Sequence, residues 1–448
     1  MTMPLTDAGS KRLYARAVGL LPGGVNSPVR AMRSIGRDPL FIERGEGAEI
    51  VDVDGNRYLD WVCSWGPLVH GHAPAAVVAA IQAAAERGTS FGAPTAVEVE
   101  LAAELVQRVP GVEMVRMTSS GTEAAMSAVR LARAVTGRDL VLRFAGAYHG
   151  HVDGLLAAAG SGLATQGIPA SPGVPAQVAA QTVVIPWNDR AALEAAVDEH
   201  DLAAILAEPY PANMGLVPPE PGFLESLRAA ADANGCLLIF DEVISGFRVA
   251  RGGAQELAGV RPDLTVMGKI IGGGLPGAVF GGRRELMERI APAGDVYQAG
   301  TLSGNPVAAA AGIVALSLLD DDAYIRLGQL TQALADALRA AAGDRPVQVQ
   351  SAPGLLTVFF SPDPVRDYAG ARECDLAAHA AWCRALLEHG VYPPPSQFEA
   401  WFPSLAHDQD AVAATAAAAA EAFSEALDGG PTGPSSTSGD PGERVRDE

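Results

Sequence analysis

Short apolar runs alternate with helix-like segments from about Ala76 onward, and this alternation constrains the fold more than any other feature of the sequence. Apolar residues recur at helical spacing in 74–87 and 95–109. Four apolar runs bounded by turn-forming residues are typical of buried parallel strands, at 140–145, 182–186, 202–209 and 236–242. Strands that alternate with helices predict an α/β domain with a mostly parallel sheet.

The regions on either side have a different pattern. Residues 45–60 alternate apolar and polar residues around an Asp-Gly pair, which predicts a β-hairpin. From about Gly312, long helical segments surround strand-like runs at 347–352 and 355–360, which predicts a smaller α+β domain. The expected organisation is an N-terminal segment that packs with the small domain (1–64), a large cofactor-binding domain (65–315), a C-terminal small domain (316–427) and a disordered tail rich in Gly, Pro, Ser and charge (428–448).

Composition argues against several classes of protein. A formal net charge of −20 disfavours binding to nucleic acids and to anionic membranes. The four cysteines are scattered and form no CxxC pair, which indicates reduced thiols rather than a disulfide frame or a zinc site. No apolar run reaches the roughly 18 residues of a membrane span, and the opening residues lack the apolar core of a signal peptide. We therefore expect a cytoplasmic protein.

Lysine is rare in this chain, which has 32 basic residues but lysine only at Lys11 and Lys269. Lys269 lies between apolar residues and a run of glycines, where a buried ammonium is costly unless it has a use. A strand-like segment, 263–268, delivers this lysine to a strand end, 28 residues after Asp241 at the end of another apolar strand. In open α/β sheets, ligands bind at the carboxyl ends of the strands.

A carboxylate and a lysine on neighbouring strand ends suit a pyridoxal phosphate site. Lysine can form a Schiff base with the cofactor aldehyde, whereas a guanidinium stays protonated and cannot. The carboxylate of Asp241 can hold the pyridine nitrogen protonated, so that the ring accepts electrons. Taken alone, Asp241 also fits a strand that ends in solvated acids. A P-loop is rejected because Ile270 follows Lys269 where Ser or Thr should bind magnesium.

Residues 119–122, with the sequence SSGT, immediately precede a helical segment and predict a site for the cofactor phosphate. Hydroxyls and free backbone N–H groups at a helix start bind anions. An ordinary N-cap with Glu123 in the first turn is the alternative, and the presence of Lys269 favours the phosphate site.

The segment that follows the predicted strand at 140–145 offers an aromatic ring and two histidines. Tyr148 is predicted to stack on the cofactor, and His149 with His151 is only half a metal site, with no further ligand cluster nearby, so no metal is expected. Residues 154–176 are rich in small residues, Gly and Pro, which is typical of either a disordered loop or a functional lid. Because this loop follows directly on Tyr148, it is well placed to close over the site as a lid.

Several motifs resemble those of the class III aminotransferases, which are fold-type I pyridoxal phosphate enzymes. The resemblance covers roughly residues 10–427, and its first and last motifs are similar to the aminomutase branch of the family, which moves an amine within one substrate. The matching motifs are PGGVNSPVRA (22–31), SFGAPT (90–95), SSGTEAAMSAVRLAR (119–133), YHGHVD (148–153), NMGLVPP (213–219), DEVISGFR (241–248), YQAGTLSGNP (297–306) and PPPSQFEAWFPSLAH (393–407).

The resemblance implies pyridoxal 5′-phosphate or pyridoxamine 5′-phosphate as cofactor, a small-molecule substrate and a homodimer. The implied catalytic residues are Lys269, Asp241 and Tyr148. The implied cofactor-binding residues are Ser120, Gly121, Thr122, Tyr148, Glu208, Asn213, Asp241, Lys269 and, from the partner subunit, Thr301. The implied substrate-binding residues are Ser27 and Arg30 for a carboxylate, Trp65 in the pocket wall, Ser161 on the gating loop and Glu399 near the reacting amine.

This chain departs from the family pattern at a few positions. The usual EPVAGNMG is EPYPANMG here, with Tyr210 and Pro211; DEVMTGFR is DEVISGFR; and His70 replaces a residue that is commonly apolar. None of these changes removes a group that the chemistry requires. A two-substrate ω-aminotransferase and a mutase paralogue with a changed substrate stay open as alternatives. A cofactor-holding protein without activity is disfavoured because Lys269, Asp241 and the predicted phosphate loop are all present.

Overall fold

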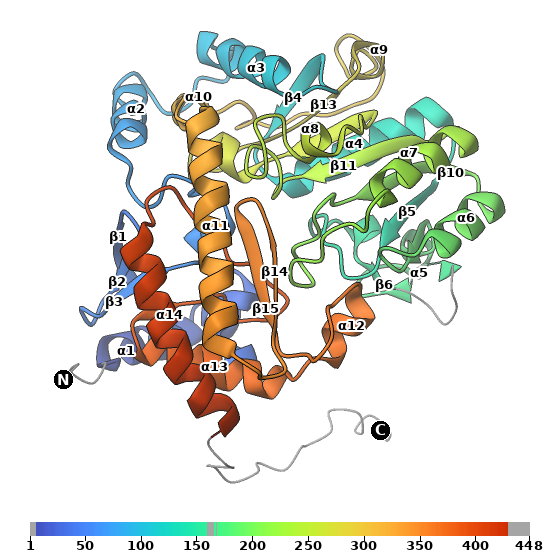
Figure 1. The fold of residues 1–448 in the computed structure, drawn as a ribbon. Coiled ribbons are helices and arrows are strands. Elements are labelled where there is room, and N and C mark those ends of the chain that lie inside the picture. The colour runs from blue at the N-terminus through green and yellow to red at the C-terminus, as the bar shows by residue number, and fades with distance from the viewer. Residues whose placement is uncertain (1–5, 159–164, 167, 429–448) are drawn as a thin grey trace, which may run out of the picture.

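The large sheet is the centre of the structure, a computed structural model that describes residues 6–158, 165–166 and 168–428. Its strands lie in the order β4-β13-β12-β11-β10-β5-β9-β7 (Figure 1). Strands β9, β5, β10, β11 and β12 are parallel neighbours, while β13 and β7 are antiparallel to their neighbours. The strands are β4 (Met114–Thr118), β5 (Leu140–Phe144), β7 (Thr165–Gln166), β9 (Thr182–Ile185), β10 (Leu202–Ala207), β11 (Leu237–Glu242), β12 (Leu264–Met267) and β13 (Ala278–Gly282). The predicted mostly parallel sheet is confirmed.

Helices cover both faces of this sheet, so its central strands are buried on both sides. In β11, Leu237 and Ile239 pack toward α4, whereas Leu238 and Phe240 pack toward α6 and α7. This explains why the central strands read as continuous apolar runs. The helices of this region are α2 (Ala75–Ala85), α3 (Ala96–Arg108), α4 (Gly121–Thr136), α5 (Ala176–Ala179), α6 (Arg190–Glu199), α7 (Phe223–Asn234), α8 (Ala254–Ala258), α9 (Arg284–Met287) and α10 (Pro306–Ser317).

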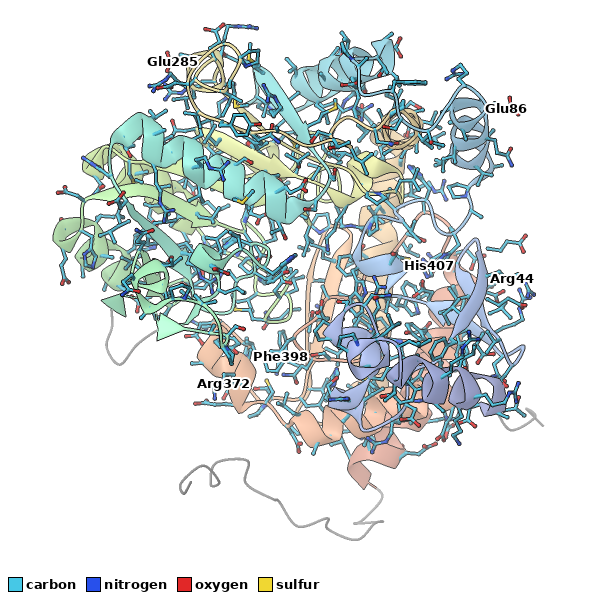
Figure 2. All side chains as sticks on the ribbon, turned by 180° about the vertical axis from the view of Figure 1, so that it is seen from behind. Arg44, Glu86, Glu285, Arg372, Phe398 and His407 are labelled. Atoms are coloured by element: carbon cyan, nitrogen blue, oxygen red, sulfur yellow. The ribbon has the colours of Figure 1, made fainter. Side chains whose placement is uncertain are left out.

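A second core joins the two ends of the chain. Trp61 packs there with Trp382, Trp401 and Phe423, and the view from behind shows the N-terminal elements beside the C-terminal helices (Figure 2). The predicted hairpin is present as β2 and β3. This region contains α1 (Ala8–Val18), β1 (Ile42–Glu46), β2 (Glu49–Asp52), β3 (Arg57–Asp60), α11 (Asp321–Ala342), β14 (Gln348–Ala352), β15 (Leu355–Phe359), α12 (Tyr368–Glu373), α13 (Leu376–Glu388), β16 (Val391–Tyr392) and α14 (Gln409–Phe423). The domain boundaries themselves stay a prediction.

Two further predictions meet the structure only in part. The segment 154–176 contains a small antiparallel pair, β6 (Ala157–Ala158) with β8 (Ile168–Pro169), and its predicted gating residue Ser161 lies outside the described residues. The predicted disordered tail lies outside them from residue 429 onward. In the described part of the chain, no helix is long and apolar enough to cross a membrane.

Gly312 lets helix α10 approach the turn that carries Lys269. A Cβ at this position would lie 1.9 Å from the carbonyl oxygen of Ile271. Gly328, in the middle of α11, has nothing within 4 Å of the corresponding point. The two helical glycines therefore have different roles, and only Gly312 supports the placement of Lys269.

This contrast gives the first prediction. Gly312→Ala should destabilise the protein by about 1–3 kcal/mol, because the added methyl group overpacks the contact with Ile271. Gly328→Ala should stabilise it by up to about 1 kcal/mol, because alanine is the better helix former. Urea unfolding of both variants measures the difference. Equal effects of the two substitutions would contradict the proposed role of Gly312.

Candidate functional site

A cavity of about 460 Å³ lies at the carboxyl ends of the central strands. It collects residues from the N-terminal segment, the large sheet and the C-terminal region. The site residues predicted from the sequence that line it are Ser27, Trp65, Ser120, Gly121, Thr122, Tyr148, Glu208, Asn213, Asp241, Lys269 and Glu399. The fold thus brings together groups that are separated by hundreds of residues in the chain.

Lys269 begins a short 3-10 turn, η6 (Lys269–Gly272), just after β12. Its φ of 51° is left-handed, which is uncommon for a residue other than glycine and aims the side chain into the cavity rather than along the strand. The Nζ atom donates a hydrogen bond to the carbonyl oxygen of Trp65 at 2.5 Å. Burial lowers the lysine pKa to about 8, against the opposing pull of nearby carboxylates, first among them Glu399.

Asp241 is the next-to-last residue of β11, and its carboxylate is held by two partners. One oxygen is 2.8 Å from Nδ1 of His149, and the other accepts the backbone N–H of Val243 at 3.1 Å. His149 is fully buried, and burial lowers its pKa although the hydrogen bond to Asp241 raises it. Among the described residues, no cluster of three or more metal-binding side chains is present. Through its contact with the carboxylate, His149 orients Asp241.

Sequence reasoning missed this role of His149. The motif YHGH drew attention to a histidine pair, and nothing in the spacing connects residue 149 to residue 241. The contact depends on the neighbouring ends of β5, β10 and β11, which only the sheet order reveals.

Two carboxyl groups share the cavity with the lysine, Glu208, which is buried, and Glu399, which is partly buried. Burial raises the pKa of Glu208 to about 8, although this carboxyl accepts hydrogen bonds from the Tyr148 N–H, the Ala212 N–H and the Asn213 side chain. Burial likewise raises the pKa of Glu399 to about 7, and Lys269 opposes that shift. Groups that titrate near neutrality within one cavity can hold and pass protons.

The start of helix α4, just after the carboxyl end of β4, also lines the cavity. The Ser120 hydroxyl accepts the N–H of Glu123 at 3.2 Å, and the Glu123 carboxylate accepts the N–H of Ser119 at 2.7 Å. The hydrogen bonds of an ordinary N-cap, the alternative considered for this segment, are therefore present. It does not displace the anion site, because the first N–H groups of a helix have no intrahelical partner and residues 119–122 line the cavity.

The Trp65 carbonyl belongs to a strained turn, η4 (Cys63–Trp65). Cys63, Ser64 and Trp65 have φ values of 44°, 57° and 68°, all in the left-handed region. Such conformations cost about 1–3 kcal/mol each and persist only where the surroundings enforce them. The turn places the Trp65 ring on the cavity wall and its carbonyl against Lys269. No sequence pattern signalled this turn.

Two predicted site residues, Arg30 and Thr301, do not line the cavity. Arg30 is exposed on the short turn η2 (Pro28–Ala31). Thr301 is exposed and lines a separate hollow with residues of the 90–94 segment. Ser161 lies outside the described residues. The roles predicted for these residues stay predictions.

Among the positions that depart from the family pattern, Ile244 lines the cavity, whereas Tyr210 and His70 face the scaffold. Tyr210 packs into an apolar cluster with Phe402 and Leu355. Nε2 of His70 lies 2.8 Å from the carbonyl oxygen of Ala315 on α10. Tyr210 and His70 do not line the cavity, so these two departures leave its wall intact, whereas Ile244 is a departure within the wall itself.

Comparisons with known proteins agree with this geometry. Residues 32–414 match the family model for aminotransferase class III. A protein from Pelotomaculum thermopropionicum named glutamate-1-semialdehyde 2,1-aminomutase is 54% identical over 425 residues, 94% of this chain and 98% of that protein. A protein of the same name from Roseiflexus castenholzii is 55% identical over 419 residues, 92% of this chain and 96% of that protein.

Solved structures give the same result for the fold. An omega-transaminase from Sphaerobacter thermophilus superposes with a TM-score of 0.86 at 35% identity, covering 93% of this chain and 97% of that one. A glutamate-1-semialdehyde aminomutase from Pseudomonas aeruginosa superposes with a TM-score of 0.84 at 29% identity, covering 94% and 95%. The chain belongs to the class III aminotransferase family. The two curated relatives named above are both aminomutases.

The low pKa of Lys269 gives the second prediction. Acylation of the purified full-length protein without added ligand, followed by mass spectrometry, reports the neutral fraction of each lysine as a function of pH. Lys269 should become reactive with a midpoint near pH 8. Glu399→Gln should move this midpoint to lower pH, because the Glu399 carboxylate favours the ammonium form. An unchanged midpoint in this variant would contradict the coupling.

Proposed function

We propose that this protein is a pyridoxal-phosphate-dependent glutamate-1-semialdehyde 2,1-aminomutase. The reaction converts (S)-4-amino-5-oxopentanoate to 5-aminolevulinate through 4,5-diaminovalerate, in tetrapyrrole biosynthesis. The observation that carries the proposal is that relatives with this name are more than half identical to the chain over more than 90% of both sequences. The cavity supplies the groups that this chemistry needs.

The cavity fits pyridoxal phosphate or pyridoxamine phosphate. The start of α4 suits the phosphate, Asp241 suits the protonated pyridine nitrogen, and Lys269 provides an amine whose pKa of about 8 keeps part of it neutral. Tyr148 is half-exposed on the cavity wall, where its ring can stack on the cofactor. When bound, the cofactor carries the amine and accepts electrons from the substrate carbon.

The protein groups supply the proton transfers and the substrate contacts. Lys269 can take and return a proton near neutral pH, because burial keeps its pKa low. Glu399, also titrating near neutrality, faces this lysine and is placed to receive a substrate ammonium. Asp241, held by His149, stays oriented toward the site of the ring nitrogen. Ser27 and Trp65 bound the side where the rest of the substrate lies, and Arg30 is the proposed partner of its carboxylate.

The second candidate is a two-substrate ω-aminotransferase. The likeness to the Sphaerobacter omega-transaminase favours it, because that protein has the same fold and is 35% identical to this chain. The two candidates differ in whether a second substrate is needed.

The third prediction separates these candidates. The purified protein, given glutamate-1-semialdehyde alone, should form 5-aminolevulinate over many turnovers without an added donor or acceptor. Lys269→Ala should lower turnover by about a thousandfold or more, because it removes the proton-transferring amine. A strict requirement for a second substrate would favour the ω-aminotransferase. Full turnover by Lys269→Ala would contradict the catalytic assignment.

We also propose a cytoplasmic homodimer in which Thr301 reaches the partner's phosphate site. Four free cysteines suit a reducing compartment. Near Thr301, the exposed apolar residues Tyr297, Leu302 and Phe91 offer a surface that a second subunit can cover. Thr301 is exposed and remote from the cavity of its own chain, as a contribution in trans requires.

The fourth prediction tests the trans contribution with two inactive variants, Lys269→Ala and Thr301→Glu. After the two variants are unfolded and refolded together, hybrid dimers should contain one intact site, made of Lys269 from one chain and Thr301 from the other. Random pairing makes half of the dimers hybrids, so roughly a quarter of the wild-type activity should return. No recovery, with dimers confirmed by light scattering, would place Thr301 in its own chain's site.

A further inference from the structure

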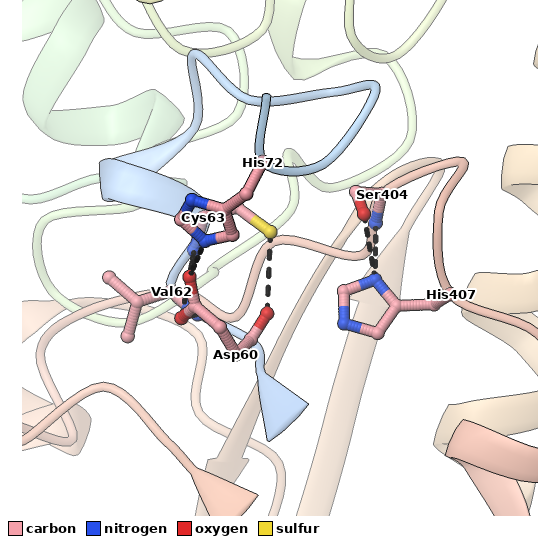
Figure 3. Close-up of polar contacts among 6 residues, drawn as sticks. All are labelled: Asp60, Val62, Cys63, His72, Ser404 and His407. Atoms are coloured by element: carbon pink, nitrogen blue, oxygen red, sulfur yellow. Dashed lines mark hydrogen bonds and ion pairs between the residues drawn. The ribbon is translucent and has the colours of Figure 1, made fainter. Parts of the chain in front are cut away.

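Asp60 holds the residues that enter the strained turn. It ends β3, its side chain is buried, and its carboxylate accepts the N–H of Val62 at 2.8 Å and the N–H of Cys63 at 3.2 Å (Figure 3). The Cys63 thiol donates to the Asp60 carbonyl oxygen at 3.3 Å, and burial, which raises the pKa of this thiol, keeps its proton in place. One residue thus fixes the start of the turn through its main chain and its side chain.

His72 fixes the Asp60 carboxylate in turn. Its Nε2 lies 2.6 Å from Asp60 Oδ2, whereas the Val62 N–H donates to the other oxygen, Oδ1 (Figure 3). His407 forms a hydrogen bond with Ser404 and stacks on the ring of Trp61, the residue after β3, with ring centroids 3.8 Å apart. Asp60 is therefore part of a rigid cluster that lies outside the cavity lining.

A buried arginine holds the far end of the same turn. Arg248 donates to the carbonyl oxygen of Gly66, and also to those of Gly354 and Pro403 at 3.1 Å each. Its guanidinium lies 5.2 Å from the centre of the Phe402 ring, which the Lys269 Nζ also approaches, at 5.6 Å. The turn is therefore clamped at both ends, as left-handed conformations of ordinary residues require.

Between these two ends of the turn, the carbonyl oxygen of Trp65 accepts a hydrogen bond from the Lys269 ammonium. We propose that Asp60 is a positioning residue: by holding the left-handed turn of residues 63–66, it sets the place of the free Lys269 amine through the Trp65 carbonyl. The proposal rests on the proposed function only in taking Lys269 as the reacting amine. A carbonyl acceptor favours the ammonium over the neutral amine. Loss of this contact therefore lets the amine move more freely and lose its proton more easily.

The test is the acylation rate of Lys269 relative to Lys11 in the full-length protein loaded with pyridoxamine 5′-phosphate, which leaves the lysine amine free. Because the chain has only these two lysines, Lys11 is an internal reference. Asp60→Asn should raise the Lys269 to Lys11 ratio by about three- to tenfold, the size expected for the loss of one ordinary hydrogen bond. The turnover number should fall in the same variant.

The matched control is Asp375→Asn. The Asp375 carboxylate also accepts two backbone N–H groups, from Ala377 and Ala378, but it neither lines the cavity nor contacts the helix that carries Lys11, so the labelling ratio should not change. A second variant, Asp60→Asn with Ser64→Gly, should move the ratio back toward the wild-type value, because glycine adopts the φ of 57° without strain. Ser64→Ala, which keeps the strain, should not rescue.

The outcomes distinguish this proposal from the proposed function. A folded Asp60→Asn protein with the wild-type labelling ratio would overturn the positioning role. If Asp60→Asn does not fold, His72→Gln removes only the outer partner of the carboxylate and should raise the ratio in the same direction; an unchanged ratio there would overturn the role. A wild-type protein that forms no 5-aminolevulinate but shows these labelling changes refutes the aminomutase function and keeps the positioning role.

Discussion

The burial of one amine among carboxyl groups is the interaction on which the rest of the site depends. Burial drives the Lys269 pKa toward neutrality, and Glu399, Glu208 and Asp241 limit the shift, so the amine can change protonation at physiological pH. The same burial raises the pKa of Glu208 and of Glu399. Lysine and carboxyl groups thus approach each other in proton affinity, which suits proton transfer in both directions.

The scaffold contributes to this site by backbone geometry as much as by side chains. Parallel strands β11 and β12 bring Asp241 and Lys269 to one edge. Gly312 lets α10 approach the backbone of the lysine turn, and the left-handed turn that ends in Trp65 supplies the acceptor for the amine. Each of these features costs conformational freedom or strain, which the packed cores on both sides of the cavity can absorb.

Much of the fold was predictable because its signals are local. The central strands are apolar runs and the flanking helices have regular apolar spacing, so the predicted strands agree with the structure to within a residue or two. Lys269 was predictable because lysine is otherwise almost absent. His149, Asp60 and the left-handed turn were not, because their roles depend on contacts between distant segments and on backbone angles. Arg30 and Thr301 were named by resemblance, and a single chain does not bring them to the cavity.

The central claim is that this site exchanges amines within one substrate and restores its own cofactor. The absorption spectrum of the purified, cofactor-loaded protein during consumption of glutamate-1-semialdehyde tests it most directly. The account predicts a transient change that returns to the starting spectrum when the substrate is exhausted, with nothing else added. A change that persists after one equivalent of substrate per site, and reverses only when an external amine donor or acceptor is supplied, would contradict it.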